Sequence, residues 1–302
     1  MAETLNLVNQ DDVLSCKYEI SKFPDGQQSV KIVEHQYNTF LSLSDRTNSI
    51  TIKSRLNTFQ DIELIICANQ ALKEIGVKSV KLFIPYCIGG RSDRKFQEGG
   101  INYIKTVIAP IINSQNFDEV KIMDPHSDVL EACINNFVKY TNFPLLKMAL
   151  PDIDNKNDAQ ERICLVSPDA GAYKKIFDVA QRFGIKNVVT AMKHRDIETG
   201  KITHTEVPNI DQYGEDHKFV IVDDICDGGR TFTELSKEIR KHNALSEIHL
   251  IVTHGIFSAG LKPLNQEFTS IFCTNSYSDM NDPEFSLRND NEMHQLKQLN
   301  VF

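Results

Sequence analysis

The chain has 302 residues, of which 41% are hydrophobic and 25% are charged, and this length and composition suit roughly two soluble domains. Its formal net charge of -8 excludes the broad basic surface that a general nucleic-acid or anionic-membrane binder needs. Its seven cysteines are odd in number and none forms a CxxC pair, so we expect neither a disulfide framework nor a zinc cluster.

The first stretch, MAETLNLVNQDD, has no basic segment followed by an apolar one, and no apolar run in the chain approaches the ~18 residues of a membrane span. We therefore expect a cytoplasmic protein with no membrane and no nucleic-acid partner.

The first half of the chain alternates between helical and extended patterns. Apolar residues recur at helical spacing over residues 60–74, and residues 76–85 read as a connection followed by a strand that ends at Pro85. Residues 103–115 have a helical pattern that Pro110 interrupts. Residues 118–128 read as a strand that runs into polar residues.

The second half repeats this rhythm. Strands are predicted within 162–171, 187–193, 219–229 and 247–257, and helices over 172–184 and 231–244. The tail, residues 292–302, is predicted to be helical. Strands that alternate with helices of this length indicate βαβ units on a mostly parallel sheet, in which ligands bind at the carboxyl ends of the strands.

An internal similarity suggests two domains of related origin. Residues 87–92 (CIGGRS) and 226–231 (CDGGRT) each follow an apolar strand and lie about half the chain apart. The segment 142–157 contains two prolines and a polar, acidic end, which is typical of a boundary. We therefore predict domains at 1–147 and 148–302. The pattern leaves open whether the C-terminal tail packs on the N-terminal domain or on its own domain.

The stretch FVIVDDICDGGRTF, residues 219–232, joins an apolar strand to acids and a glycine turn. Asp223 and Asp224 point to opposite faces if the strand continues through them. Carboxylates accept hydrogen bonds from sugar hydroxyls, and a glycine turn that leads into a helix offers backbone amides to a phosphate. The pattern favours a phosphorylated sugar, and an acidic strand end beside an ordinary turn is the structural alternative. The candidate binding residues are Asp223, Asp224, Asp227, Gly228, Gly229, Arg230 and Thr231.

This stretch resembles the phosphoribosyl-pyrophosphate (PRPP) binding signature of type I phosphoribosyltransferase folds. The whole chain resembles the ribose-phosphate pyrophosphokinases, which contain two such domains in tandem. The supporting segments are FPDGQQSVKI (23–32), IPYCIGGRSDRK (84–95), DPHSD (124–128), VSPDAG (166–171), MKHR (192–195), DDICDGGRT (223–231) and THGIFS (253–258).

The resemblance implies an α/β fold of two tandem phosphoribosyltransferase-like domains, each a mostly parallel sheet flanked by helices. It implies an enzyme that transfers the β,γ-diphosphoryl group of ATP to the anomeric C1 hydroxyl of ribose 5-phosphate, which gives PRPP and AMP. Such a transfer concentrates negative charge, so it needs Mg2+ and cationic side chains. The resemblance assigns His126 and Asp169 to the metal.

The resemblance also assigns the remaining site residues. Lys193 and Arg195 match the catalytic cations of the family's flap, and residues 194–218 read as a mobile lid. The ATP-binding set is Phe23, Asp25, Gln27, Arg91, Ser92, Asp93, Arg94 and His126. Phe23 and Asp25 match a loop that reaches the nucleotide of an adjacent subunit, which implies a homo-oligomer built from dimers, up to a hexamer.

Four residues depart from the family pattern. Ser92 replaces a usual glutamine and Gln27 a usual glutamate. In the phosphate loop, Gly228 replaces a threonine and Arg230 a glycine. The Arg230 guanidinium either points to solvent or binds a second phosphate. In the second case the acceptor is a 5'-extended ribose phosphate such as ADP-ribose, whose pyrophosphate would feed NAD synthesis.

Two further alternatives come from other classes. A non-catalytic regulatory homologue would be expected to lose the flap cations or the metal histidine. A phosphoribosyltransferase would have one such domain and a separate hood.

Overall fold

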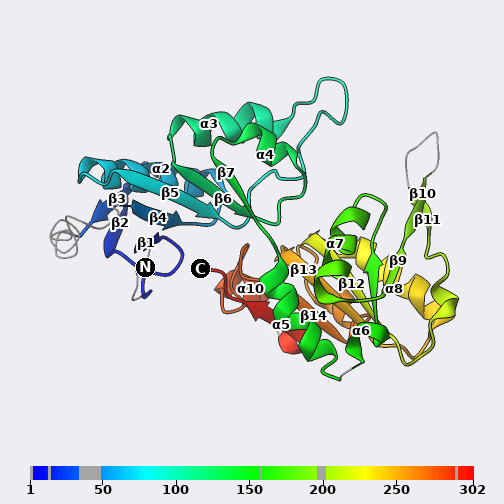
Figure 1. Ribbon diagram of the computed structural model, residues 1–302. Coiled ribbons are helices and arrows are strands. Elements are labelled where there is room, and N and C mark those ends of the chain that lie inside the picture. The colour runs from blue at the N-terminus through cyan, green and yellow to red at the C-terminus, as the bar shows by residue number, and fades with distance from the viewer. Residues whose placement is uncertain (1–2, 13–14, 34–48, 157, 196–201, 290–291) are drawn as a thin grey trace. The chain divides into compact units, whose positions relative to one another are not determined.

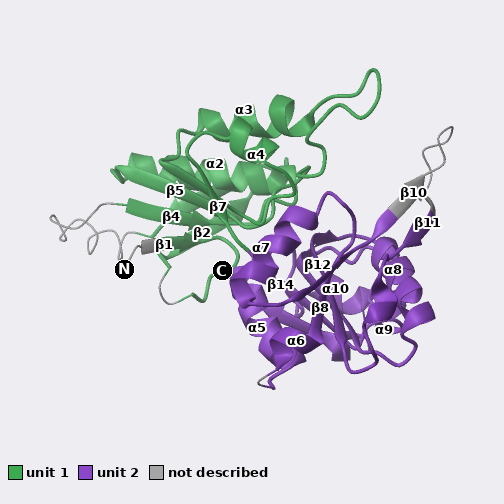
Figure 2. Cartoon of the chain, turned by 45° about the vertical axis from the view of Figure 1, so that its right-hand side comes forward, with its two compact units in different colours: residues 1–141, 302 green, residues 142–301 purple. Residues whose placement is uncertain are grey.

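The computed structural model describes the chain except residues 1–2, 13–14, 34–48, 157, 196–201 and 290–291, and it describes residues 3, 193–195 and 202–203 by their backbone alone (Figure 1). The chain forms two compact units (Figure 2). Unit 1 contains residues 1–141 and Phe302, and unit 2 contains residues 142–301.

The division between the units comes earlier than the predicted boundary at 147–148. Helix α5 (Phe143–Ile153) spans the predicted boundary and lies wholly in unit 2. Its buried residues Leu145, Leu146 and Ala149 share a core with Leu165 and Val220. Cutting the helix would separate one apolar face from the sheet it covers.

Unit 1 is built on a parallel five-stranded sheet with the order β1-β4-β5-β6-β7. The strands are β1 (Glu3–Asn6), β4 (Ser49–Lys53), β5 (Ser79–Ile84), β6 (Glu119–Met123) and β7 (Phe137–Tyr140). The helices are α2 (Phe59–Glu74), the π-helical turn η1 (Ile104–Ile108), α3 (Ala109–Ser114) and α4 (Val129–Cys133). These elements confirm the predicted helices and strands of the first half.

Local chemistry explains where two of these helices begin and bend. Thr58 caps α2, because its hydroxyl accepts from the Asp61 amide at 3.2 Å and the Asp61 carboxylate accepts from the Thr58 amide at 2.7 Å. Pro110 stands in the first turn of α3, directly after η1. A proline cannot donate a backbone hydrogen bond, so the predicted interruption takes the form of a π-helical turn before it.

A β-hairpin was missed by the sequence analysis. Strands β2 (Tyr18–Lys22) and β3 (Gln28–Ile32) pair antiparallel, apart from the main sheet. The Gln28 amide donates to Glu63 Oε1 at 3.1 Å, which fastens the hairpin to α2.

Unit 2 is built on a parallel six-stranded sheet with the order β15-β14-β13-β12-β8-β9. The strands are β8 (Ile163–Ser167), β9 (Asn187–Thr190), β12 (Lys218–Cys226), β13 (Ile248–Gly255), β14 (Ser270–Thr274) and β15 (Leu296–Leu299). A separate antiparallel pair joins β10 (Met192–Arg195) to β11 (Ile202–Glu206). The remaining helices are α6 (Ala159–Arg162), α7 (Tyr173–Phe183), η2 (Ile210–Gln212), α8 (Arg230–His242), α9 (Lys262–Asn265), α10 (Pro283–Arg288) and η3 (Met293–Gln295).

The prediction of a helical tail was wrong. After η3 the chain forms strand β15, in which Leu296 lies opposite Ile271 of β14. The apolar spacing of the tail fits a helix, but the edge of β14 offers backbone hydrogen bonds that decide the outcome. The tail therefore belongs to the sheet of unit 2, and only Phe302 is grouped with unit 1.

The strand order of unit 2 reverses at one place. From β8 the chain moves outward to β9, and it then returns to place β12 on the other side of β8. In parallel α/β sheets, ligands bind beside the carboxyl ends of the strands at such a reversal. The order of unit 1 has no reversal among its described strands. Across the described residues, none of the helices has the length and apolar character needed to span a bilayer.

Candidate functional site

Two carboxylates lie at the end of β12, beside the reversal. Asp224 is 6% exposed and Asp223 is half-buried, and the Asp224 amide donates to Asp223 Oδ1 at 2.9 Å. Burial is the largest cause that raises the pKa of Asp223 well above its ordinary value, and the neighbouring Asp224 carboxyl group is the second. Lys175 opposes the shift. Such a pair favours a partner that donates hydrogen bonds or carries positive charge.

The glycine turn after β12 leads directly into α8. Gly229 has a φ of +77°, and a Cβ on it would lie 2.9 Å from Leu264 Cδ2, so both the backbone and the packing select glycine. Within the described chain, no hydrogen bond uses the amides of Gly228, Gly229, Arg230 or Thr231. Successive unused amides at the N-terminus of a 13-residue helix are groups that can donate hydrogen bonds to an anion.

The two unusual residues of this turn behave differently from each other. The Arg230 side chain is 88% exposed, and its Nε lies 2.6 Å from Glu234 Oε1, one turn along α8. The hydrogen bond and charge of Glu234 raise the pKa of Arg230. A Cβ at Gly228 would make only ordinary contacts, 3.8 Å from Ser258 Oγ and 4.0 Å from the Ala259 Cβ. Position 228 can therefore accept a side chain.

Asp169 shapes the turn between β8 and α7. Its Oδ1 accepts from the Gly171 amide at 3.0 Å and from the Ala172 amide at 3.1 Å, while the Ser167 hydroxyl donates to its carbonyl at 2.7 Å. β8 and β12 are parallel neighbours, so Asp169 and the β12 acids lie at the same edge of the sheet.

The predicted catalytic residues, Lys193 and Arg195, belong to strand β10. Lys193 is opposite Thr205 of β11, and the side chains of Lys193 and Arg195 lie outside the described part of the structure. Figure 1 shows this hairpin extending away from the sheet of unit 2. The predicted lid over residues 194–218 was too long, because Val207 and Ile210 are buried in the core of unit 2. That burial fixes the chain after β11.

In unit 1, residues 23–27 form the tip of the β2–β3 hairpin. The Phe23 amide donates to the Gln27 carbonyl at 2.8 Å, and the Gln27 amide donates to Asp25 Oδ1 at 3.1 Å. Gly26 has a φ of +98°, as the turn requires. The Phe23 ring is half-exposed at the tip.

The predicted ATP segment follows β5. Asp93 is buried, whereas Arg91 and Arg94 are exposed, and the Arg94 guanidinium lies 5.4 Å from the centre of the Phe96 ring. Ser92 has a structural role, because its carbonyl accepts from the Tyr103 amide at 3.0 Å before η1 begins.

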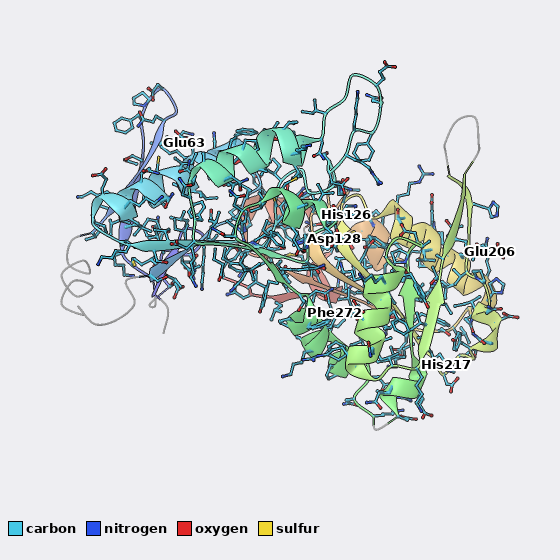
Figure 3. The ribbon with its side chains drawn as sticks, turned by 45° about the horizontal axis from the view of Figure 1, so that its top comes forward. Glu63, His126, Asp128, Glu206, His217 and Phe272 are labelled. Carbon is cyan, nitrogen blue, oxygen red and sulfur yellow. The ribbon has the colours of Figure 1, made fainter. Side chains whose placement is uncertain are left out.

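The segment after β6 places His126 at the same edge of the sheet. β5 and β6 are parallel neighbours, and His126 and Asp128 follow β6 with exposed side chains. Figure 3 shows both on one turn, far from Glu63 and the hairpin. His126 and the 91–94 segment therefore follow neighbouring strands at the same edge of the sheet. The 23–27 tip lies elsewhere in unit 1.

The two similar loops do not share a conformation. The left-handed glycine of the first loop is Gly89, and that of the second is Gly229, which aligns with Gly90. A Cβ at Gly89 would lie 2.3 Å from Tyr103 Cδ1. A long helix follows the second loop at once, but not the first. Of the two loops, only the second leads directly into a helix N-terminus.

Comparison with known proteins shows what the chain resembles. Residues 146–282 match the phosphoribosyl transferase domain. The chain is 26% identical to a ribose-phosphate pyrophosphokinase of Sulfurisphaera tokodaii over 265 residues, which cover 86% of this chain and 84% of that one. It is 27% identical to the enzyme of that name from Methanobrevibacter smithii over 303 residues, with 92% and 89% covered.

A solved structure supports the fold. The phosphoribosylpyrophosphate synthetase of Mycobacterium smegmatis superposes with a TM-score of 0.77 at 16% identity, with 99% of this chain and 94% of that chain covered. The predicted fold class is confirmed: α/β, with mostly parallel sheets flanked by helices. Over most of its length the chain is thus similar to ribose-phosphate pyrophosphokinases, and its second half matches the phosphoribosyl transferase domain.

Proposed function

We propose that this protein transfers the β,γ-diphosphoryl group of ATP to the C1 hydroxyl of ribose 5-phosphate, giving PRPP and AMP. The observation that carries the proposal is the set of unused amides at residues 228–231, which start α8 beside the acids of β12. A phosphate accepts these amides, while ribose hydroxyls donate to carboxylates.

The proposed acceptor site assigns a role to each part of the loop. The amides of Gly228 to Thr231 bind the 5-phosphate, and Asp223 and Asp224 accept from the ribose hydroxyls. The raised pKa of Asp223 supports this role, because hydrogen bonds from the sugar would offset the cost of a buried carboxylate.

The proposed nucleotide contacts come from the segment after β5 and from the tip of the β2–β3 hairpin. Arg91, Ser92, Asp93 and Arg94 take the ATP segment's role, and the backbone of Ser92 holds the segment in place through its bonds to Gly89 and Tyr103. Exposed guanidinium groups suit phosphates. Arg94 lies beside Phe96, so the pair offers a cation for the phosphates and a ring for the base. Phe23, Asp25 and Gln27 serve the nucleotide of a neighbouring subunit in a homo-oligomer.

We propose that Mg2+ is required, with His126 and Asp169 as the metal-linked residues. Among the described residues no group of three or more His, Cys, Asp or Glu side chains is placed to hold a metal. Mg2+ keeps several of its waters and binds substrate phosphates, so it needs few protein ligands. The bound ion would neutralise charge on the transferring phosphates.

The reaction can be tested directly. The protein is incubated with ATP, Mg2+ and ribose 5-phosphate, and the nucleotide products are separated. We expect AMP, formed only when all three are present, and no AMP after chelation of the metal. ADP in place of AMP, or no nucleotide product, would refute the pyrophosphokinase proposal and favour a non-catalytic homologue or a different transferase.

A 5'-extended acceptor such as ADP-ribose is the second candidate. The space beside Gly228, where a Cβ would meet nothing closer than 3.8 Å, favours it by leaving room near the 5-phosphate. The pairing of Arg230 with Glu234 disfavours it, because the guanidinium is directed along the helix. We therefore place ribose 5-phosphate first.

A further inference from the structure

The phosphate loop is fastened to the segment that follows β13. The amides of Ile256 and Phe257 donate to the Cys226 carbonyl at 2.9 and 3.2 Å, and the Ser258 amide donates to the Asp227 carbonyl at 3.1 Å. These bonds join residues 256–258 to the start of the glycine turn.

The same segment is held firmly in place. Phe257 has a φ of +49°, which is uncommon for a residue with a side chain. Its ring is 1% exposed, lies 6.3 Å from the Phe285 ring between centroids, and passes so close to Gly255 that a Cβ there would lie 2.2 Å away. A strained backbone held by buried packing fixes the position of the next residue, Ser258.

Ser258 uses that position to bind a carboxylate. Its hydroxyl donates to Asp227 Oδ1 at 2.6 Å. Asp227 stands immediately before the unused amides of the phosphate loop. Aspartate side chains commonly accept from the amides two and three residues later, which here belong to Gly229 and Arg230.

We propose that Ser258 is a positioning residue that keeps the Asp227 carboxylate off the phosphate-binding amides. Without the hydroxyl, Asp227 rotates and caps the amides of Gly229 and Arg230. An internal anion then occupies the place of the substrate phosphate. This inference rests on the proposed acceptor site.

The first test measures binding without catalysis. Ribose 5-phosphate is titrated into the full chain without ATP, for the parent, Ser258→Ala and Ser258→Thr. Because a cap of this kind is worth about 1 kcal/mol, we expect about 5-fold weaker binding for Ser258→Ala. Ser258→Thr, which keeps the hydroxyl, should bind as the parent does. Ser114→Ala is the matched control, since the Ser114 hydroxyl makes an exposed 2.7 Å bond to the Ile111 carbonyl in unit 1.

A second measurement separates capping from a merely structural role. In the ligand-free protein, the amide proton resonances of Gly229 and Arg230 should move downfield in Ser258→Ala and return in Asp227→Ala/Ser258→Ala. The effect of Ser258→Ala on binding should also vanish in the Asp227→Ala background.

The outcomes distinguish the two proposals. If ribose 5-phosphate binds the parent and Ser258→Ala with the same affinity, or if the amide resonances do not move, the proposed role of Ser258 is overturned. The acceptor site is then unaffected. No binding to the parent would refute the acceptor site, and the role of Ser258 with it.

Discussion

The guanidinium of Arg230 is paired with Glu234 across one turn of α8, at 2.6 Å between Nε and Oε1. An exposed pair of this spacing contributes little to stability, because water and salt screen it. It nevertheless decides where the most unusual side chain of the phosphate loop points.

The acceptor preference follows from this pairing. We expect ribose 5-phosphate to have a higher kcat/KM than ADP-ribose, and the double change Gly228→Thr/Arg230→Gly to alter their ratio by less than about 3-fold. Glu234→Ala, which frees Arg230, serves as the companion variant. A preference for ADP-ribose that the double change abolishes would show instead that Arg230 leaves Glu234 to bind a second phosphate.

The two glycines of the loop should respond differently to the same substitution. Gly229→Ala should destabilise the protein by about 1–3 kcal/mol, because alanine is strained at this positive φ and its Cβ would meet Leu264. Gly228→Ala is the matched control and should cost less than about 1 kcal/mol, since its Cβ makes ordinary contacts. Urea unfolding of the two variants gives the comparison, and equal losses would contradict the described turn.

The half-buried acid Asp223 should make stability depend on pH. Its folded-state pKa is raised above the ordinary value of 3.8, so the folded chain holds a proton there more readily than the unfolded chain. Stability from this group is present at low pH and is lost as the pH rises through the raised value. Asp223→Asn should therefore raise Tm at pH 7, by roughly 2–4 °C for each kcal/mol recovered.

The difference in Tm should close as the pH falls toward the ordinary aspartate range, where Asp223 itself is protonated in both states. Asp178→Asn, on the exposed surface of α7, is the control and should leave Tm unchanged. A lower Tm for Asp223→Asn at pH 7 would show that Asp223 is stabilised as a carboxylate.

The flap cations should matter for the rate rather than for the fold. Lys193→Ala and Arg195→Ala should each lower kcat by ~100-fold or more, because a cation placed on the developing charge stabilises the transition state most. ATP binding and Tm should remain near those of the parent. Lys147→Ala, on the exposed side of α5, controls for the loss of a charge, and an unchanged kcat in both flap variants would remove the assignment.

The sequence predicts the strands whose apolar residues must be buried in the centre of a sheet. Apolar strands such as Phe219–Val222 become buried in the centre of a parallel sheet wherever the rest of the chain can cover them, so β12 and its neighbours could be identified. The tail could not, because Leu296 and Leu299 fit a helical spacing and only the free edge of β14 makes them a strand. The lid was overestimated for a related reason, since polar neighbours hide the burial of Val207 and Ile210.

The site was predictable in composition but not in its internal contacts. The acids and glycines of β12 stand together in the sequence, and parallel topology places them at a ligand-binding edge. The partners of Asp227 and Arg230 could not be read in the same way. The partner of Asp227 is Ser258, which is distant in sequence, and its segment THGIFS indicated only the family resemblance. The partner of Arg230 is Glu234, four residues later, and the sequence analysis did not use this local signal.

The central claim is that two phosphoryl groups move from ATP as one unit, and the fate of the β-phosphorus tests it most directly. ATP radiolabelled at the β-phosphorus is incubated with the protein, Mg2+ and ribose 5-phosphate, and the products are separated. We expect the label in a sugar pyrophosphate that forms in step with unlabelled AMP. Label retained in ADP, or released as inorganic phosphate or pyrophosphate without a labelled sugar, would contradict the claim.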